Sequence, residues 1–260
     1  DMNIVVCVKQ VPDTWAEKKL NPSDNTLDRA SVDAVVNELD EYAIEEALQL
    51  AEANGGEVTV LSMGPERTTE SIRKALSMGA ARGVHVVDDA LAGSCAVSTS
   101  KALAKAIAKE QPDLIIFGSE STDARMSVVP AMVAEILGYP QLTFANKVTV
   151  DGSSVKIHRQ TESGYDEVEA STPAVVSVVE KINEPRYPNF KGIMAAKKKP
   201  VDTLTVAELG LSADEVGAAC ASSVVVSFED APARAAGQVI TDAGDGGVKI
   251  AEYLSTQKFI

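Results

Sequence analysis

Short apolar runs and segments of helical periodicity alternate along the first half of the chain. The apolar runs have strand length and cover residues 3–8, 57–62, 84–88 and 114–118. The segments with apolar residues every three to four positions cover residues 37–53, 69–78 and 98–110. Strands separated by helices predict a parallel sheet, because each parallel connection needs a crossover. The expected fold class is therefore α/β, with a doubly wound, mostly parallel sheet.

The ends and faces of two predicted helices carry recognisable signals. Asn37 is a suitable N-cap for the first helix, and Asp40 lies in its first turn. Its predicted buried stripe consists of Ala43, Ala47, Leu48 and Ala51. Gly79 follows the second helix directly and predicts its end.

The second half of the chain has a different pattern. From residue 147 the sequence VTVDGSSVKIHR predicts an antiparallel hairpin that turns at Asp151-Gly152, with a further strand at residues 166–170 and an apolar one at 174–179. After Pro200, a short helix-like VAELGL leads into a polar, alanine-rich tail that ends in a helical IAEYLSTQKF. We expect an α/β nucleotide-binding domain over residues 1–200. Residues 201–260 are expected to form an arm that lacks a core and packs on another chain.

The composition of the chain limits the kinds of molecule that it can bind and the compartments in which it can work. The chain has 260 residues, 45% of them hydrophobic, and a formal net charge of -14. Such an acidic chain is a poor binder of nucleic-acid polymers, and no apolar run approaches the roughly 18 residues that cross a bilayer. Three widely spaced cysteines and an opening strand without a charged leader favour a cytoplasmic location.

A ligand site is expected at the carboxyl ends of the parallel strands, where the topology switches. Neither GxGxxG nor GxxxxGK[ST] occurs in the chain. Instead, residues 118–123 form a turn between the fourth strand and a predicted helix at 127–137. Free backbone N–H groups at such a helix start suit an anion such as a phosphate. A capped loop without a ligand explains the same residues.

Nothing in the sequence resembles a catalytic centre. His85 lies within a strand pattern and is expected in the core, whereas His158 lies on the hairpin and is expected in solvent. Glu45 and Glu46 are read as a solvated helix face. No histidine is spaced with cysteine as metal ligands are. We therefore expect neither catalytic residues nor a metal site.

Residues 183–199, NEPRYPNFKGIMAAKKK, have no regular period. Pro185 and Pro188 argue against both a helix and a central strand, which predicts an outward loop. Tyr187 and Phe190 lie beside Arg186 and Lys191, a composition typical of protein-binding hot spots. The alternative is a surface turn whose aromatic side chains fold back onto the core.

This loop, together with NIVVCVKQVPD, NELDEYAIEEALQL, LSMGPERTTESIRKALSMGA, GSESTDARMSVVP and IHRQTESGYDEVEASTPAVVS, resembles the electron transfer flavoprotein β subunit. The resemblance covers nearly the whole chain. It implies an adenine-nucleotide α-hydrolase-like fold and a heterodimer with an α subunit. It also implies docking on flavin dehydrogenases, such as acyl-CoA dehydrogenases of fatty acid oxidation, through Phe190, with Tyr187 and Lys191 beside it. The electrons would pass through an interface FAD to a quinone-linked oxidoreductase.

The resemblance also implies an AMP site in this subunit. The matching residues are Cys7, Asn37, Glu38, Leu39, Asp40, Met63, Gly118, Ser119, Thr122, Asp123, Arg125, Met126, Ser127, Val128 and Val129. The last five depart from the usual family pattern of Asn or Thr, Gln and Gly. Ser127, backbone amides and Arg125 would then hold the phosphate. A bifurcating branch of the family binds a second FAD here, for which Arg125 and Met126 are unfavourably bulky.

FAD, by the same resemblance, is held mainly by the α subunit and covered by two loops of this chain. Trp15 is the aromatic candidate of the first loop, and Asp166 is the acidic residue that can pair with an arginine of the partner. Glu167 is an equally suitable donor of that charge. Two alternatives stay open: the bifurcating homologue, and a standalone adenine-nucleotide-binding stress-type protein.

Overall fold

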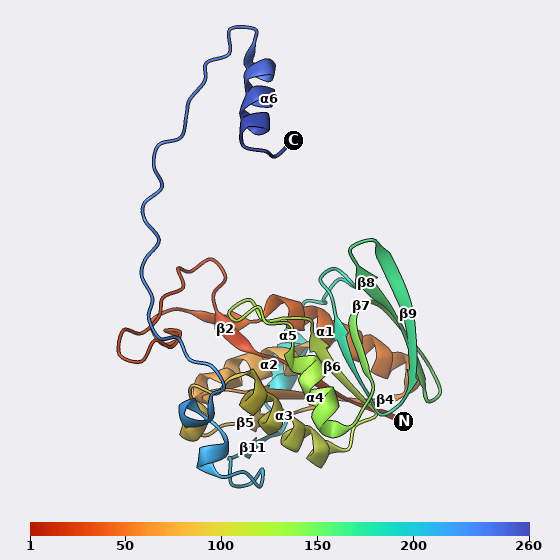
Figure 1. The fold of residues 1–260 in the computed structure, drawn as a ribbon. Coiled ribbons are helices and arrows are strands. Elements are labelled where there is room, and N and C mark those ends of the chain that lie inside the picture. Colours follow the sequence, from red (N-terminus) through yellow and green to blue (C-terminus); the bar gives the residue numbers. More distant parts are fainter. The chain divides into compact units, whose positions relative to one another are not determined.

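The computed structural model describes all residues, 1–260, as two compact units, Asp1–Val226 and Ser227–Ile260. The first unit is built on a nine-stranded sheet with the order β11-β5-β4-β1-β6-β10-β7-β8-β9 (Figure 1). The central position of β1, between β4 and β6, makes it the point where the strand order reverses. The α/β class with a large, mostly parallel sheet is thus confirmed.

Seven strands of the sheet run parallel and two are antiparallel additions. The parallel strands are β1 (Met2–Cys7), β4 (Gly56–Met63), β5 (Arg82–Val86), β6 (Leu114–Gly118), β7 (Gln141–Asp151), β10 (Ala174–Val178) and β11 (Val201–Leu204). β8 (Ser154–Thr161) and β9 (Gly164–Ser171) extend β7 as an antiparallel hairpin. A separate two-stranded sheet pairs β2 (Gln10–Pro12) with β3 (Ala34–Val36).

Helices cover both faces of the parallel core, and each face has its own apolar cluster. One cluster joins the sheet to α1 (Glu38–Asn54) and α2 (Thr69–Met78). The other joins it to α3 (Ala96–Glu110) and α4 (Val129–Leu137). Short 3-10 turns occur at Glu66–Thr68, Asp89–Leu91, Ala213–Glu215 and Ala218–Cys220. The predicted stripe of α1 is confirmed, because Ala43, Ala47, Leu48 and Ala51 are all buried.

Most predicted elements are present, with boundaries shifted by one or two residues. The hairpin turns at Asp151-Gly152 as expected, and Gly79 ends α2 with a backbone N–H that reaches back to Ala75 and Leu76. β7 begins at Gln141, six residues before the predicted change of pattern. The helix-like VAELGL forms successive turns rather than a helix. The small β2-β3 sheet was not predicted, since three-residue strands have no usable period.

The prediction that residues 183–199 are entirely non-helical was wrong. α5 (Phe190–Ala196) lies within this segment. Pro188 precedes the helix, so it removes none of its hydrogen bonds, and Asn189 caps the helix by accepting from the Gly192 N–H at 2.7 Å.

The segment after β11 divides between the two units. Val206, Leu209 and Val216 are buried in the α3-α4 cluster of the first unit. The second unit contains α6 (Gly246–Thr256), none of whose residues is buried. Val248, Ile250 and Tyr253 of α6 are exposed apolar side chains. That residues 201–260 pack on a partner chain stays a prediction. None of the helices has both the length and the apolar character to cross a membrane.

Replacing Gly118 with alanine tests the close packing of α1 on the sheet. A Cβ at Gly118 would lie 2.8 Å from the Leu39 carbonyl carbon and 3.0 Å from the Asp40 nitrogen, so α1 would have to shift. We expect Gly118→Ala to lower the free energy of unfolding by about 1–3 kcal/mol in denaturant titrations. Gly237→Ala, which meets no atom within 4 Å, is the matched control. Equal stability of the two variants would contradict this packing.

Candidate functional site

The carboxyl ends of β1 and β6 bring several predicted site residues together. Cys7 ends β1 and pairs in register with Phe117, the residue before Gly118 at the end of β6. Gly118 lies directly against Leu39 and Asp40 in the first turn of α1. Met63 ends the neighbouring β4 and packs against the same apolar cluster as Cys7. The structure thus gathers at the switch point residues that are over 100 positions apart in the chain.

Asn37 joins α1 to the turn after β6. Its side-chain amide donates to the Glu120 carbonyl at 2.8 Å, and its Oδ1 accepts from the Thr122 N–H at 3.0 Å. The side chain therefore does not cap α1, contrary to the sequence prediction. Both hydrogen bonds are made to backbone groups of the turn, and Asn37 is buried, so this residue fixes the shape of the turn.

Asp40 is the titratable group at the centre of this junction. Its carboxylate accepts from the Lys9 N–H at 2.7 Å. Burial raises the pKa of Asp40 to about 7, although hydrogen bonds from the Lys9 amide and the Asn37 side chain partly oppose the rise. Burial, with the nearby Asp40, also raises the pKa of the Cys7 thiol. Cys7 is therefore a compact neutral wall at neutral pH rather than a thiolate.

The second half of the turn has the features of an anion site. Arg125 and Ser127 adopt left-handed backbone conformations, with φ of 51° and 58°. The N–H groups of Met126, Ser127, Val128 and Val129 have no acceptor in the protein. Thr122 Oγ1 is buried without a partner. These unpaired donors at the start of α4 fit a phosphate group.

Two side chains expected at the phosphate are already engaged. Ser127 Oγ donates to Glu120 Oε2 at 2.9 Å, and the Arg125 guanidinium lies 3.3 Å from Glu120 Oε1. Glu120 lies in the predicted turn, but its pairing with Ser127 and Arg125 was not predicted, since a single carboxylate in a polar turn has no distinguishing sequence signal. In this arrangement the backbone amides, rather than Ser127 Oγ, are the available anion donors.

Asp123 holds two distant segments to the same turn. Its fully buried carboxylate forms ion pairs with Lys9 at 2.9 Å and with Arg29 at 2.7 Å. Burial alone would raise the pKa of Asp123, but Lys9, Ser121 and Arg29 together bring it well below its usual value. Lys9 and Arg29 were missed from the sequence, because only the fold brings them to residue 123.

The two residues predicted near FAD lie on separate elements, and no hydrogen bond joins them. Trp15 follows β2, and its side chain is 96% exposed. Asp166 lies on β9 opposite Arg159, is exposed, and forms no ion pair within the chain. Glu167, the alternative acidic residue, points to the other face of the hairpin and lies 3.2 Å from His158 Nε2.

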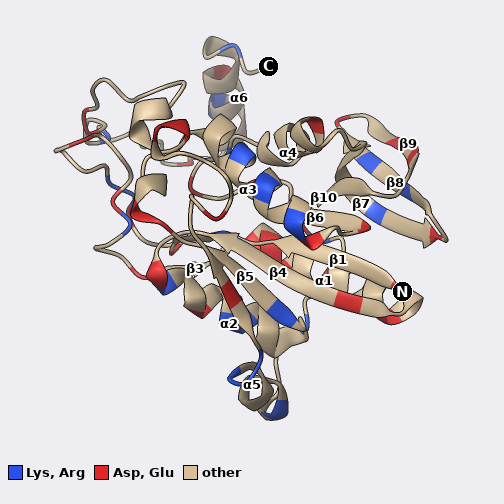
Figure 2. Ribbon diagram, turned by 90° about the horizontal axis from the view of Figure 1, so that it is seen from below, with Lys and Arg blue, Asp and Glu red and all other residues tan.

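Tyr187 and Phe190 extend into solvent from a firmly attached segment. Their exposed fractions are 95% and 78%, which contradicts the alternative that they fold back onto the core. α5 is packed on α2, with Gly192 so near the Ser77 carbonyl that a Cβ would lie 2.5 Å from its oxygen. Basic residues lie within α5 and directly after it, at Lys191 and at residues 197–199 (Figure 2). One of them, Lys199, donates to the Leu76 and Ala80 carbonyls and so holds α5 to the end of α2.

The histidines and glutamates considered in the sequence analysis contact other parts of the fold. His85 is fully buried, as predicted, and its Nε2 lies 3.0 Å from the Gly64 carbonyl oxygen. His158 stacks on Tyr165 with ring centroids 4.3 Å apart and is only partly exposed. Glu45 and Glu46 are buried, so the expectation of a solvated face was wrong. Their partners come from residues 183–186, which the helix pattern alone does not reveal. No group of three or more potential metal ligands is present.

Comparison with known proteins finds one family throughout. The electron transfer flavoprotein domain model matches residues 24–209. The electron transfer flavoprotein subunit beta of Mycobacterium tuberculosis is 54% identical over 264 residues, covering 99% of each chain. Proteins of the same name from Thermoanaerobacterium thermosaccharolyticum and Megasphaera elsdenii are 39% and 36% identical and cover 92% and 100% of each chain.

The buried Asp40 predicts a pH-dependent stability difference. Between its reference pKa of 3.8 and the folded value of about 7, the native state binds a proton that the unfolded state has lost. The stability of the native protein therefore falls with rising pH in this window, by up to about 1.4 kcal/mol per pH unit, and Asp40→Asn removes this component. Denaturant titrations of both proteins in the same buffers should show the advantage of the variant growing from about pH 4 to 7 and then levelling. A constant difference would show that Asp40 is ionised throughout.

Proposed function

Because this chain belongs to the electron transfer flavoprotein β-subunit family, we propose that it is one half of a heterodimeric electron carrier completed by an α subunit. It accepts electrons from flavin dehydrogenases that dock on residues 183–199, which include Phe190. We call these residues the docking segment. The observation that carries this proposal is the exposure of Tyr187 and Phe190 on a segment whose flanks are packed against α1 and α2. A transient protein interface requires exposed aromatic side chains on a backbone that is already held in place.

The redox group of the carrier is FAD at the interface with the α subunit. FAD supplies the one- and two-electron chemistry, and this chain provides part of its enclosure. Trp15 extends from the loop after β2 and offers an indole for contact with the α subunit or the flavin. Asp166 has no ion-pair partner within the chain, so its carboxylate is available to an arginine of the α subunit. The electrons then leave for a quinone-linked oxidoreductase.

AMP is the ligand proposed for the turn between β6 and α4. Four unpaired backbone N–H groups at residues 126–129 and the unpaired Thr122 Oγ1 support a phosphate there. Cys7, Met63 and the start of α1 form walls that suit a flat adenine. Its role is structural, because a nucleotide that binds only the folded chain stabilises it without any turnover. The proposal further includes a cytoplasmic location and acyl-CoA dehydrogenases as electron donors. It also includes packing of the arm, residues 201–260, on the α subunit.

Coexpression with the α subunit tests the assembly and its cofactors together. We expect a 1:1 heterodimer that releases one FAD and one AMP per pair on denaturation, measured by absorbance and chromatography of the extract. Thr122→Val should lower the AMP content while leaving FAD in place, because Thr122 lies in the phosphate turn and not in the elements assigned to the flavin. Two FAD per pair would indicate a bifurcating homologue. A colourless homodimer that binds ATP would reject the carrier.

Removing the aromatic side chain at the docking segment tests the second part of the proposal. Phe190→Ala should lower the second-order rate of flavin reduction by a dehydrogenase by roughly tenfold, because an exposed aromatic anchor is lost from the interface. Stopped-flow absorbance of the heterodimer measures this rate.

Val97→Ala is the control, since it truncates an exposed apolar side chain of α3 outside the docking segment. FAD content should be the same in both variants. If Phe190→Ala reacts at the wild-type rate, Phe190 is not the anchor.

A further inference from the structure

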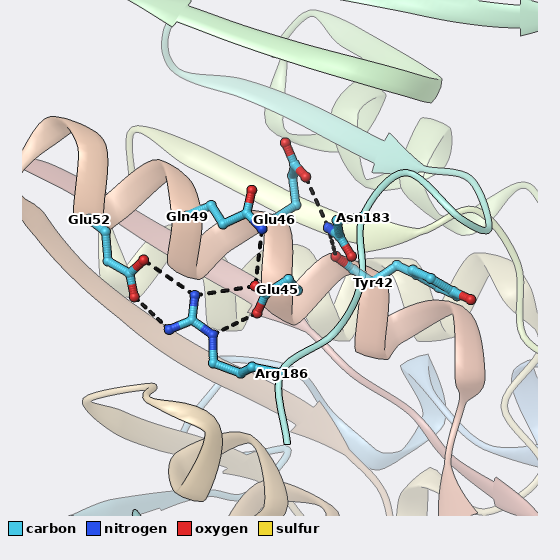
Figure 3. A network of polar contacts seen from close by, with 7 residues as sticks. All are labelled: Tyr42, Glu45, Glu46, Gln49, Glu52, Asn183 and Arg186. Atoms are coloured by element: carbon cyan, nitrogen blue, oxygen red, sulfur yellow. Dashed lines mark hydrogen bonds and ion pairs between the residues drawn. The ribbon is translucent and has the colours of Figure 1, made fainter. Parts of the chain in front are cut away.

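Arg186 lies at the start of the docking segment, and its side chain points toward α1 (Figure 3). Its Nε donates to Glu45 Oε2 at 2.7 Å, and its Nη1 donates to Glu52 Oε1 at 2.6 Å. The remaining nitrogen lies 3.3 Å from the second oxygen of each carboxylate. Figure 3 shows the guanidinium between the two glutamates, which are seven residues apart on one face of α1. Arg186 is thus held by a two-sided, charge-assisted fork.

The surroundings make this contact stronger than an ordinary surface ion pair. The Glu45 side chain is only 7% exposed, and Gln49 donates to its Oε1 at 3.0 Å. Hydrogen bonds to Glu52 and Glu45 raise the pKa of Arg186. A buried carboxylate that lost its cation would be left without compensation, which the protein avoids by keeping Arg186 in place.

Asn183 supplies a second attachment three residues earlier. Its side-chain amide donates to the Tyr42 carbonyl oxygen and to Glu46 Oε2, both at 3.0 Å (Figure 3). Glu46 is buried, and burial raises the pKa of this carboxyl. Residues 183–186 are therefore fixed to the middle of α1, one helical turn from the Asn37–Asp40 junction.

The other side of the docking segment is fixed to α2. Arg73 of α2 donates to the Ala196 carbonyl at 2.7 Å, at the end of α5. Tyr187 and Phe190 thus lie between two anchored stretches while their own side chains remain exposed. Holding a binding segment in place before the partner arrives reduces the conformational entropy lost on docking.

We propose that Arg186 is a positioning residue for partner docking: its fork with Glu45 and Glu52 holds Tyr187 and Phe190 in the orientation that a dehydrogenase binds. This inference rests on the proposed docking role of Phe190 and adds the element that orients it. The competing explanation is that Arg186 leaves α1 and pairs directly with a carboxylate of the dehydrogenase.

The test uses the heterodimer with FAD bound and measures its reduction by a dehydrogenase at varied carrier concentration. Arg186→Gln should raise the apparent KM for the carrier on the order of tenfold and leave kcat and FAD content unchanged, because docking alone is affected. Glu52→Gln, which removes the exposed side of the fork without touching the buried one, should give a smaller rise. Amide hydrogen exchange at residues 187–192 should accelerate in both variants.

The double variant Arg186→Gln/Phe190→Ala separates the two explanations. If Arg186 acts by orienting Phe190, its substitution has less than about a twofold effect once Phe190 is gone. An undiminished effect in that background, together with wild-type kinetics of Glu52→Gln, would show direct contact with the partner and overturn the proposal. If the Arg186→Gln chain does not assemble with the α subunit, two milder variants are compared in the same way. Arg186→Lys keeps the positive charge, and Glu52→Gln leaves the contact with the buried Glu45 in place.

The outcome also distinguishes this inference from the function on which it rests. If Phe190→Ala is slow and both fork variants are normal, the docking site stands and the positioning role is rejected. If Phe190→Ala itself is normal, the docking segment has been assigned wrongly, whatever the fork variants do.

Discussion

The burial of α1 against the parallel sheet is the constraint from which the functional surfaces of this protein follow. Ala43, Ile44 and Ala47 of α1 are completely buried, and Gly118 at the end of β6 leaves no space for a side chain beside it. A helix packed this closely cannot leave its own polar groups unpaired, because a buried donor or acceptor without a partner costs about as much as several good contacts provide. Four carboxylates of α1, those of Asp40, Glu45, Glu46 and Glu52, are each bonded to another segment of the chain.

α1 positions two segments of the chain at different points along its length. At its start, Asn37 and Asp40 fix the turn after β6 and the residues after β1, which creates a row of unpaired amides at α4. One to three turns later, Glu45, Glu46 and Glu52 hold residues 183–186. A single rigid helix thus sets the geometry of both the proposed nucleotide turn and the proposed docking segment. A change that shifts α1 should disturb both sites together.

The surfaces that this chain exposes fit the proposed role of an electron carrier. The two carboxyls with strongly shifted pKa values, Asp40 and Asp123, join separate segments of the chain. What it presents outward are aromatic side chains on anchored backbone, together with an exposed hairpin edge and the apolar residues of α6. Such exposed surfaces fit the proposed contacts with other proteins, and relatives of this chain are named as subunits.

The order of strands and helices, the hairpin turn and the apolar face of α1 were determined by local pattern, because periodicity and turn chemistry act over a few neighbouring residues. The family resemblance was likewise readable from motifs alone. Only the tertiary structure decided that Asn37 bonds to the turn instead of capping its helix, that Glu45 and Glu46 are buried, that Pro188 precedes a helix, and that Lys9 and Arg29 meet Asp123. In most of these cases the deciding partner lies dozens of residues away. The free energy of a buried polar group depends on that partner, and no local pattern contains it.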